Sequence, residues 1–359
     1  MHIRQSAERK RLPAMIRWNS VDFETYAKEV FTVDSPSGYT ADVIALIEGY
    51  ARGLGYETKV HKKGTLEVMV PGVDGSRTVA TSAHVDTLGL MVRSVGGGGT
   101  LALTKVGGPI TPTLDGEYCT VITREGRRIS GTILSTSPAV HVYPDAASKS
   151  REVENLEVRL DEEVKSAEDV RALGVENGDF VFIDPKFTIT PSGFLKTRFV
   201  DDKASAVLLL MLLKYCSEEQ VKFRHNTRIY FSVFEEVGHG ASALSPEIDE
   251  FVTVDMGCVG MDLQGNEYAV SICAKDSGGP YDYELTGRLI ALAKELELPY
   301  TVDIFPFYGS DVGAARSAGL DFKGALIGSG VSASHGMERT HVKGLEATLK
   351  LIYAYLCLE

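Results

Sequence analysis

Residues 78–86 read Thr-Val-Ala-Thr-Ser-Ala-His-Val-Asp, a nearly continuous run of apolar or small residues that ends in two ionisable groups, His84 and Asp86. Such a run is expected of a strand that is buried on both faces. Strands of this kind occur in parallel sheets that helices cover on both sides. The stretch therefore predicts an α/β fold, with His84 and Asp86 at the end of a buried strand.

The segments around this strand alternate between helix and strand. Ser20 and Thr40 can each cap a helix, because apolar residues follow both of them at helical spacing. Further helices are predicted at 202–216, 281–296, 311–318 and 345–356, and further strands at 65–70, 228–234, 251–254 and 268–273. This alternation predicts a mostly parallel sheet with helices on both faces.

Residues 91–193 have a different character. Short β-rich segments are separated by glycine and proline turns, with one helical candidate near 166–173, and this pattern is typical of a small β-barrel or sandwich. The four glycines 96–99 lack the Lys-Ser/Thr and the helix start of a phosphate loop, so they predict a hairpin tip. We therefore expect residues 1–90 and 194–359 to form one discontinuous α/β domain that carries 91–193 as an insert. The strand candidates of the insert are 100–106, 118–123, 128–134 and 180–183.

The composition limits the classes of function. The 359 residues include 37 Lys and Arg against 49 Asp and Glu, which gives a net charge of −12. An acidic chain argues against nucleic-acid binding, which depends largely on neutralising phosphates, and against docking on a membrane of anionic lipid. No run of about 18 apolar residues is present, so no membrane-spanning segment is predicted.

The cysteines and the first residues bear on location. Five cysteines without Cys-x-x-Cys spacing predict neither a disulfide framework nor a structural zinc cluster. Residues 1–18 are basic but lack the apolar core of a secretory signal, and we expect a frayed tail there rather than a transit peptide. The chain is therefore predicted to be a reduced, cytoplasmic protein.

Ionisable residues stand at the ends of four segments of the α/β part. Ligands bind outside the carboxyl ends of the strands in such sheets, so we expect these residues to converge. Each alone has an ordinary explanation, such as a hydrogen-bonded histidine or a helix-capping acid. The candidates are His84 and Asp86, Asp201 and Asp202, Glu235 and Glu236, and Asp255.

Together, these candidates require positive charge. Several carboxylates buried in one place are costly unless cations compensate them, and only Arg198 and Lys203 lie near them in the sequence. A pair of divalent metal ions would supply the missing charge. Glycoside hydrolysis by two carboxylates is the alternative chemistry, but the single tryptophan and the abundance of candidate ligands favour metal-dependent hydrolysis. Serine-hydrolase, His-Glu-x-x-His and nucleotide-binding motifs are absent from the sequence.

Six motifs occur in one order along the chain: Ala83-His84-Val85-Asp86-Thr87, Asp201-Asp202-Lys203-Ala204, Glu235-Glu236-Val237-Gly238-His239-Gly240-Ala241, Val254-Asp255-Met256, Gly309-Ser310-Asp311 and Ser334-His335-Gly336-Met337-Glu338. Together they resemble the TET-type (tetrahedral) metallo-aminopeptidases, the family of glutamyl and deblocking aminopeptidases, some of which are labelled endoglucanases. The resemblance runs from about Phe23 to Leu356 and includes the position of the β-rich insert. It implies a zinc-exopeptidase-like α/β fold.

The resemblance also implies a set of metal ligands. His84 and Asp255 would bind one metal ion, Glu236 and His335 would bind the other, and Asp201 would bridge the two. Imidazole and carboxylate ligands suit zinc, and also cobalt or manganese. Two such ions can share a hydroxide and polarise the scissile carbonyl.

Two further residues acquire roles from the resemblance. Glu235 would be the general base, and Asp86 would orient His84. Successive side chains of a strand point to opposite faces, so Glu235 and Glu236 can both face the metals only if the strand ends or turns there, which Gly238 allows.

The chain departs from the family pattern near two of these residues. Lys203 replaces the usual arginine after Asp201-Asp202, which removes a bidentate donor. The residues before His335 also lack the frequent Arg-Tyr pair, and His341 is a rival ligand that we interpret as a surface or capping histidine.

These expectations define a cytoplasmic, dinuclear-metal aminopeptidase that removes N-terminal residues from short peptides. The resemblance implies that residues 91–193 make dimer contacts, so the chain would form a homo-oligomer, either a dimer or a dodecamer built from dimers. Two alternatives stay open. One is a metal-dependent deacylase or amidohydrolase that acts on small N-acylated compounds, and the other is a metal-free scaffold of the same fold.

Overall fold

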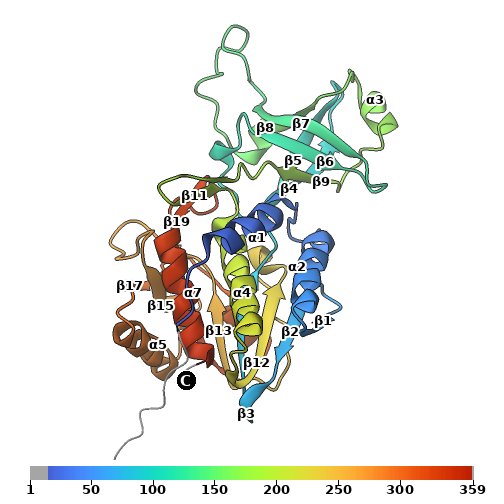
Figure 1. Cartoon of the computed structure of the whole chain (residues 1–359). Helices are drawn as coiled ribbons and strands as arrows, with labels where there is room; N and C mark the ends of the chain where they lie inside the picture. Colours follow the sequence, from blue (N-terminus) through green and yellow to red (C-terminus); the bar gives the residue numbers. More distant parts are fainter. Residues whose placement is uncertain (1–14, 358–359) are drawn as a thin grey trace, which may run out of the picture.

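The computed structural model describes residues 15–357 (Figure 1), so most of the predicted basic tail lies outside the described residues. It contains a large mixed sheet, a three-stranded sheet and a closed barrel. The α-helices of the described part are α1 (Ser20–Thr32), α2 (Ala41–Gly53), α3 (Ala167–Ala172), α4 (Val200–Glu218), α5 (Tyr283–Glu295), α6 (Asp311–Ser317) and α7 (Val342–Cys357).

The large sheet has the strand order β1-β2-β12-β3-β13-β18-β15-β16, with β14 beside β18 and β17 beside β15. Its centre is parallel, because β3 runs parallel to β12 and β13, and β13 runs parallel to β18. On either side of this centre, β2 and β15 pair antiparallel to it. The α/β prediction is thus confirmed, with a parallel centre in a mixed sheet. The strands are β1 (Glu57–Val60), β2 (Leu66–Val70), β3 (Gly72–His84), β12 (Phe223–Ser232), β13 (Glu250–Val254), β14 (Gly257–Cys258), β15 (Val270–Asp276), β16 (Gly279–Pro280), β17 (Tyr300–Ile304) and β18 (Lys323–Val331).

Helices cover both faces of this sheet, as predicted. On one face α4 packs against β3 and also contacts α1, α2 and α7 (Figure 1). The residues of α4 are buried on nearly every side, which explains why its sequence is apolar all round. On the other face, Val312 and Ala315 of α6 pack with Phe251 in a separate core cluster. Among residues 15–357, no helix combines the length and apolarity needed to cross a bilayer.

Strand β18 was not predicted, because its glycines weaken the strand signal in its sequence. The fold requires two of them. A Cβ added at Gly328 would lie 1.3 Å from the carbonyl oxygen of Asp255, and one at Gly330 would lie 2.1 Å from that of Asn266. Glycine within a strand often marks such a close approach of another backbone. The backbones of Asp255 and Asn266 therefore account for Gly328 and Gly330 in β18.

The β-rich insert closes into a six-stranded barrel, with the order β4-β5-β8-β7-β6-β9, so the barrel alternative is right and the sandwich alternative is wrong. Gly96–Gly99 form the tip of the β4–β5 hairpin, as predicted. In Figure 1 the barrel lies above the large sheet. The barrel strands are β4 (Gly89–Val95), β5 (Thr100–Val106), β6 (Tyr118–Ile122), β7 (Arg128–Ser135), β8 (Leu156–Leu160) and β9 (Phe180–Ile183), of which β4 and β8 were not predicted.

A small antiparallel sheet joins the two parts of the chain. It pairs β10 (Thr188–Ile189) with β11 (Phe194–Thr197), and β11 with β19 (Glu338–His341). The segment that leaves the barrel is thereby fixed to the segment that follows His335. The domain limits at residues 90 and 193 stay a prediction.

Candidate metal centre

The register of the parallel strands brings the predicted residues to one edge of the sheet. His84, the last residue of β3, pairs with Ser232, the last residue of β12. On the other side of β3, Ser82 pairs with Thr253 of β13, which places Asp255 level with His84. The carboxyl ends of three neighbouring strands therefore meet where the sequence predicted convergence.

The segment after β12 turns sharply, and this turn presents two adjacent glutamates. Glu235–Val237 form a short 3-10 helix between Phe234 and Gly238, whose φ angles of 67° and 82° lie in the left-handed region. A bulky residue such as Phe234 adopts this conformation only under constraint. The constraint is the buried Asp86 carboxylate, which accepts hydrogen bonds from the backbone N–H groups of Glu235 (3.1 Å) and Glu236 (3.3 Å). Strand β12 thus ends before the glutamates, so both side chains can face the same site, as the prediction from the sequence required.

The imidazole of His84 is buried beside these acids. Its Nδ1 donates to the backbone carbonyl of Asp86 at 2.9 Å, while the Asp86 carboxylate lies 3.7 Å away. Its Nε2 lies 2.9 Å from Oδ1 of Asp201 and 3.8 Å from Oε2 of Glu235. The ring is therefore oriented through the Asp86 backbone, while the Asp86 carboxylate holds the glutamate turn.

Asp201 and Asp202 lie in the first turn of α4, where the backbone is not helical and the peptide bond between them is cis. The Asp202 Oδ2 atom accepts a hydrogen bond from the backbone N–H of His84 at 3.3 Å, and its buried Oδ1 atom has no partner. The backbone N–H of Asp201 donates to Oε2 of Glu338 at 3.0 Å. Both carboxylates are thus fixed toward the end of β3.

His335 completes the cluster from a distant segment. Its Nε2 lies 3.5 Å from Oδ2 of Asp201 and 3.7 Å from Oε2 of Glu236, and its Nδ1 donates to the carbonyl of Gly108 at 3.0 Å. Its backbone N–H donates to Oε1 of Glu338 at 2.8 Å. Glu338 therefore joins His335 to Asp201, a role that the Ser-His-x-x-Glu motif contained but that sequence reasoning did not assign.

The rival histidine lies elsewhere. His341 Nε2 donates to the carbonyl of Ser192 at 2.9 Å, and its Nδ1 accepts the backbone N–H of Lys343 at 3.1 Å, at the start of α7. The ring packs edge-on against Phe194. His341 is therefore a buried residue that caps α7, away from the carboxylate cluster.

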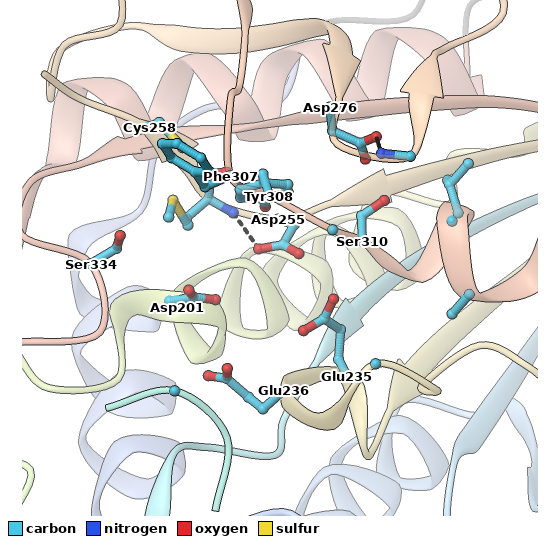
Figure 2. Close-up of a pocket in the computed structure, with 18 of the residues that line it drawn as sticks. Asp201, Glu235, Glu236, Asp255, Cys258, Asp276, Phe307, Tyr308, Ser310 and Ser334 are labelled. Carbon is cyan, nitrogen blue, oxygen red and sulfur yellow. Dashed lines mark hydrogen bonds between the residues drawn. The ribbon is translucent and has the colours of Figure 1, made fainter. Parts of the chain in front are cut away.

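The ligand atoms lie close enough to share metal ions. Those of His84, Asp201 and Glu236 all lie within 4.8 Å of one another, and so do those of His84, Asp202 and Asp255. Figure 2 shows the carboxylates of Asp201, Glu236 and Asp255 around one common space. The structure thus brings the predicted ligands together, and it adds Asp202 to the group.

The electrostatics of the cluster indicate a shortage of positive charge. Burial raises the pKa of Glu235 and of Glu236 well above the usual value, and burial together with the charge of Asp201 raises the pKa of Asp255 to about 7. Burial lowers the pKa of His335, but the hydrogen bond and charge of Asp201, with smaller contributions from Gly108 and Glu338, together raise that pKa to about 9. These four groups bind a proton more tightly than they do in water, as expected where several carboxylates lie together without a cation. Asp201 is the exception: burial raises its pKa, but its hydrogen bonds with His335 and His84 and the charges of these imidazoles together lower it.

The two basic residues expected near the cluster do not supply this cation. Arg198 donates to the carbonyl of Thr113 at 2.7 Å and pairs with Glu117, and Lys203 donates to the carbonyl of Val33. The buried Oε1 atom of Glu236 has no partner, like the Oδ1 atom of Asp202. Unpartnered carboxylate oxygens beside imidazole nitrogens fit a divalent transition metal such as zinc.

A cavity of about 730 Å³ opens onto the cluster, and sequence reasoning could not place its walls. One side is formed by cluster residues that include Glu235, Asp255 and His335. Tyr308, whose hydroxyl donates to the Met256 carbonyl at 3.0 Å, lies against it. The volume suits a small-molecule or peptide-end ligand.

Comparison with known protein families places the chain among the peptidases. The sequence pattern of the M42 glutamyl aminopeptidase family matches residues 64–351. The chain belongs to this family.

Similar proteins agree with this placement. The Bacillus subtilis protein YhfE, which carries the name of an aminopeptidase, is 43% identical over 330 residues that cover 92% of this chain and 95% of its own. A TET aminopeptidase from a Thaumarchaeota archaeon has the same fold, with a TM-score of 0.85 at 20% identity over 93% of this chain and 96% of its own. The TET1 peptidase of Pyrococcus horikoshii can assemble into a tetrahedron or a large octahedral shell. It gives a TM-score of 0.81 at 23% identity over 93% of this chain and 98% of its own.

Proposed function

We propose that this chain is an aminopeptidase that depends on two divalent metal ions and removes N-terminal residues from short peptides. The observation that carries the proposal is the buried cluster of carboxylates and imidazoles at the strand ends. Within residues 15–357, no lysine or arginine forms an ion pair with Asp201, Glu235, Glu236 or Asp255. Membership of an aminopeptidase family supports the proposed reaction.

In this proposal His84 and Asp255 hold one ion, Glu236 and His335 hold the other, and Asp201 bridges them. The short distances from Asp201 to both imidazoles support the bridging role. Zinc suits this donor set best, and cobalt and manganese also suit it. When bound, such ions supply Lewis acidity toward the scissile carbonyl and toward a water molecule.

Glu235 is the proposed general base. It has no assigned ligand role, it lines the cavity, and the Asp86 carboxylate fixes its backbone. Its carboxylate takes the proton of the attacking water and then gives it to the leaving amine. The surrounding carboxylates accept hydrogen bonds from the free amine of the substrate, which favours peptides with an unblocked N-terminus.

The test is a panel of free and N-acylated peptides, assayed on the full chain with added zinc, cobalt or manganese. We expect release of N-terminal residues from free peptides only, together with about two bound ions per chain. Glu235→Gln protein, purified in parallel, controls for a contaminating peptidase. Cleavage of the acylated compounds alone would instead support the deacylase alternative, and neither metal nor turnover would support a scaffold.

Association through the barrel is the second part of the proposal. Val140 and Val142 follow β7 in the barrel region and are each 71% exposed. Together with Tyr143, which is 39% exposed, they place several exposed apolar side chains close together in the sequence, and contact with a second copy of the chain would bury them. Light scattering after size exclusion tests this part. Val142→Asp should reduce the oligomer, whereas Val73→Asp, at a similarly exposed valine (69%) at the start of β3, should not.

A further inference from the structure

The cavity continues beyond the metal cluster to a second acid, Asp276, the last residue of β15. In Figure 2, Asp276 and Ser310 lie on the opposite side of Asp255 from Asp201. From this arrangement we propose that Asp276 selects substrates whose N-terminal residue has a cationic side chain, lysine or arginine. The inference rests on the proposed aminopeptidase function and specifies its substrate.

Asp276 is 4% exposed, and its carboxylate is held only by neutral donors. The Tyr281 hydroxyl donates to its Oδ2 at 2.6 Å, and the backbone N–H of Gly278 donates to its Oδ1 at 2.7 Å. The Tyr281 oxygen also lies 2.8 Å from Oγ of Ser310, so Ser310 can donate to Tyr281 while Tyr281 donates to Asp276. This chain of donors stabilises the anionic carboxylate and fixes its position in the cavity wall.

No cation of the described residues neutralises this carboxylate. Neighbouring Lys275 donates to the backbone carbonyl of Asp276, at 2.9 Å, and the structure gives the carboxylate itself no lysine or arginine partner. A buried carboxylate without a cation is costly, and a cationic ligand in the cavity removes part of that cost. An acidic ligand would instead meet Asp276 on one side and the cluster carboxylates on the other.

The same wall leaves room for a long side chain. Gly309 and Gly313 line the cavity, and a Cβ atom added at either glycine would meet no atom within 4 Å. Gly313 belongs to α6, and its backbone has ordinary helical geometry. The aliphatic part of lysine or arginine can therefore extend past these glycines to Asp276.

Arg316 is the competing determinant, because it lines the cavity too and would favour an acidic residue. It is exposed, its Nη1 donates weakly to the Pro280 carbonyl at 3.4 Å, and its guanidinium lies 5.9 Å from the centre of the Phe322 ring. Exposed ion pairs contribute little, whereas a hydrogen bond to a buried charge contributes more. Asp276 therefore has a larger effect than Arg316 on which N-terminal side chain the cavity accepts.

The experiment measures kcat/KM of the metal-loaded full chain for lysyl, arginyl, leucyl, alanyl and glutamyl anilides. We expect the wild type to prefer lysyl and arginyl substrates to leucyl by about tenfold or more. Asp276→Asn should lower the lysyl value by about 10- to 100-fold and the leucyl value by less than about threefold. Asp321→Asn, the same change at an exposed site, is the matched control and should leave the ratio unchanged.

Gly313→Leu provides an independent test if Asp276→Asn folds poorly. The introduced leucine side chain should fill the space needed by lysyl and arginyl side chains, while turnover of the alanyl anilide persists. The inference is overturned if leucyl or glutamyl substrates are preferred, if Arg316→Ala removes a glutamyl preference, or if neither variant changes the lysyl-to-leucyl ratio. Absence of turnover on every anilide would refute the aminopeptidase function itself, which is a different outcome.

Discussion

Glu235 and Glu236 are adjacent and chemically identical, yet replacing each of them by glutamine should affect metal content and turnover differently. Glu235→Gln should keep both metal ions and lose the general base, a loss of about 100- to 10,000-fold in kcat. At 1.36 kcal/mol per tenfold, this corresponds to about 2.7–5.4 kcal/mol of transition-state stabilisation. Glu236→Gln should instead deplete mainly one ion, because Glu236 is proposed to bind only the ion that it shares with His335, whose Nε2 lies 3.7 Å from its Oε2.

The structure makes the two variants matched controls for each other. The Asp86 carboxylate binds the backbone N–H of each glutamate, and neither substitution removes these bonds. Each variant removes one buried charge at nearly the same place. A purely electrostatic role of the pair would therefore give two similar phenotypes.

The assay is metal content per chain, measured by elemental analysis, beside turnover of an aminoacyl anilide for each variant. A Glu235→Gln protein that has lost one ion, beside a fully loaded but inactive Glu236→Gln protein, would mean that the two roles are reversed. Equal and mild effects in both would refute the catalytic interpretation of the motif.

Three further outcomes follow from the site. Asp201→Asn should lower the occupancy of both ions together in the same elemental analysis, and retention of two tightly bound ions would shift the bridging role to Asp202. Asp86→Asn places an amide N–H₂ against backbone donors, so it should lower the stability by about 1–3 kcal/mol and kcat by tenfold or more, as thermal denaturation and kinetics would measure. In the chelated protein, the pKa of Asp255 is about 7 and that of His335 is about 9, whereas the values in the unfolded chain are roughly 4 and 6.5. Because both groups bind protons more tightly in the folded chain, their contribution to the free energy of unfolding is complete at low pH. It is lost as the pH rises through about 7 for Asp255 and about 9 for His335. The melting temperature of chelated protein should therefore fall between pH 6 and pH 9, and zinc should suppress the fall; a flat profile in chelator contradicts the raised pKa values.

Local sequence patterns predicted the bounds of several elements closely. Strand β9 has the predicted bounds, Phe180–Ile183, and α6 begins at the predicted residue, Asp311. The start of α1 was also predicted, but Asn19 rather than Ser20 is its cap, since the Asn19 side chain accepts the backbone N–H groups of the two residues after Ser20. Here two residues of similar capping strength are adjacent, and the sequence alone does not separate them.

Features that depend on distant segments were missed. Gly328 and Gly330 of β18 are explained only by the backbones of Asp255 and Asn266, which approach that strand in the fold. Glu338 acquires its role because it contacts the backbones of Asp201 and His335, and Asp201 is 137 residues away in the sequence. The convergence of the strand-end residues was predictable because a parallel sheet imposes it.

The hydrogen bonds between His335 and the segment after β5 have a consequence for protein engineering. The Gly108 carbonyl accepts a hydrogen bond from the His335 ring, and the backbone N–H of Ile110 donates to the His335 carbonyl at 3.0 Å. A shortened chain that joined residue 90 to residue 194 would keep every strand of the large sheet but lose both contacts. Its imidazole would lose the hydrogen-bond acceptor of Nδ1, which orients the ring nitrogen that faces Asp201. A minimal version of this protein therefore has to retain residues 107–113, or supply a substitute acceptor for that ring.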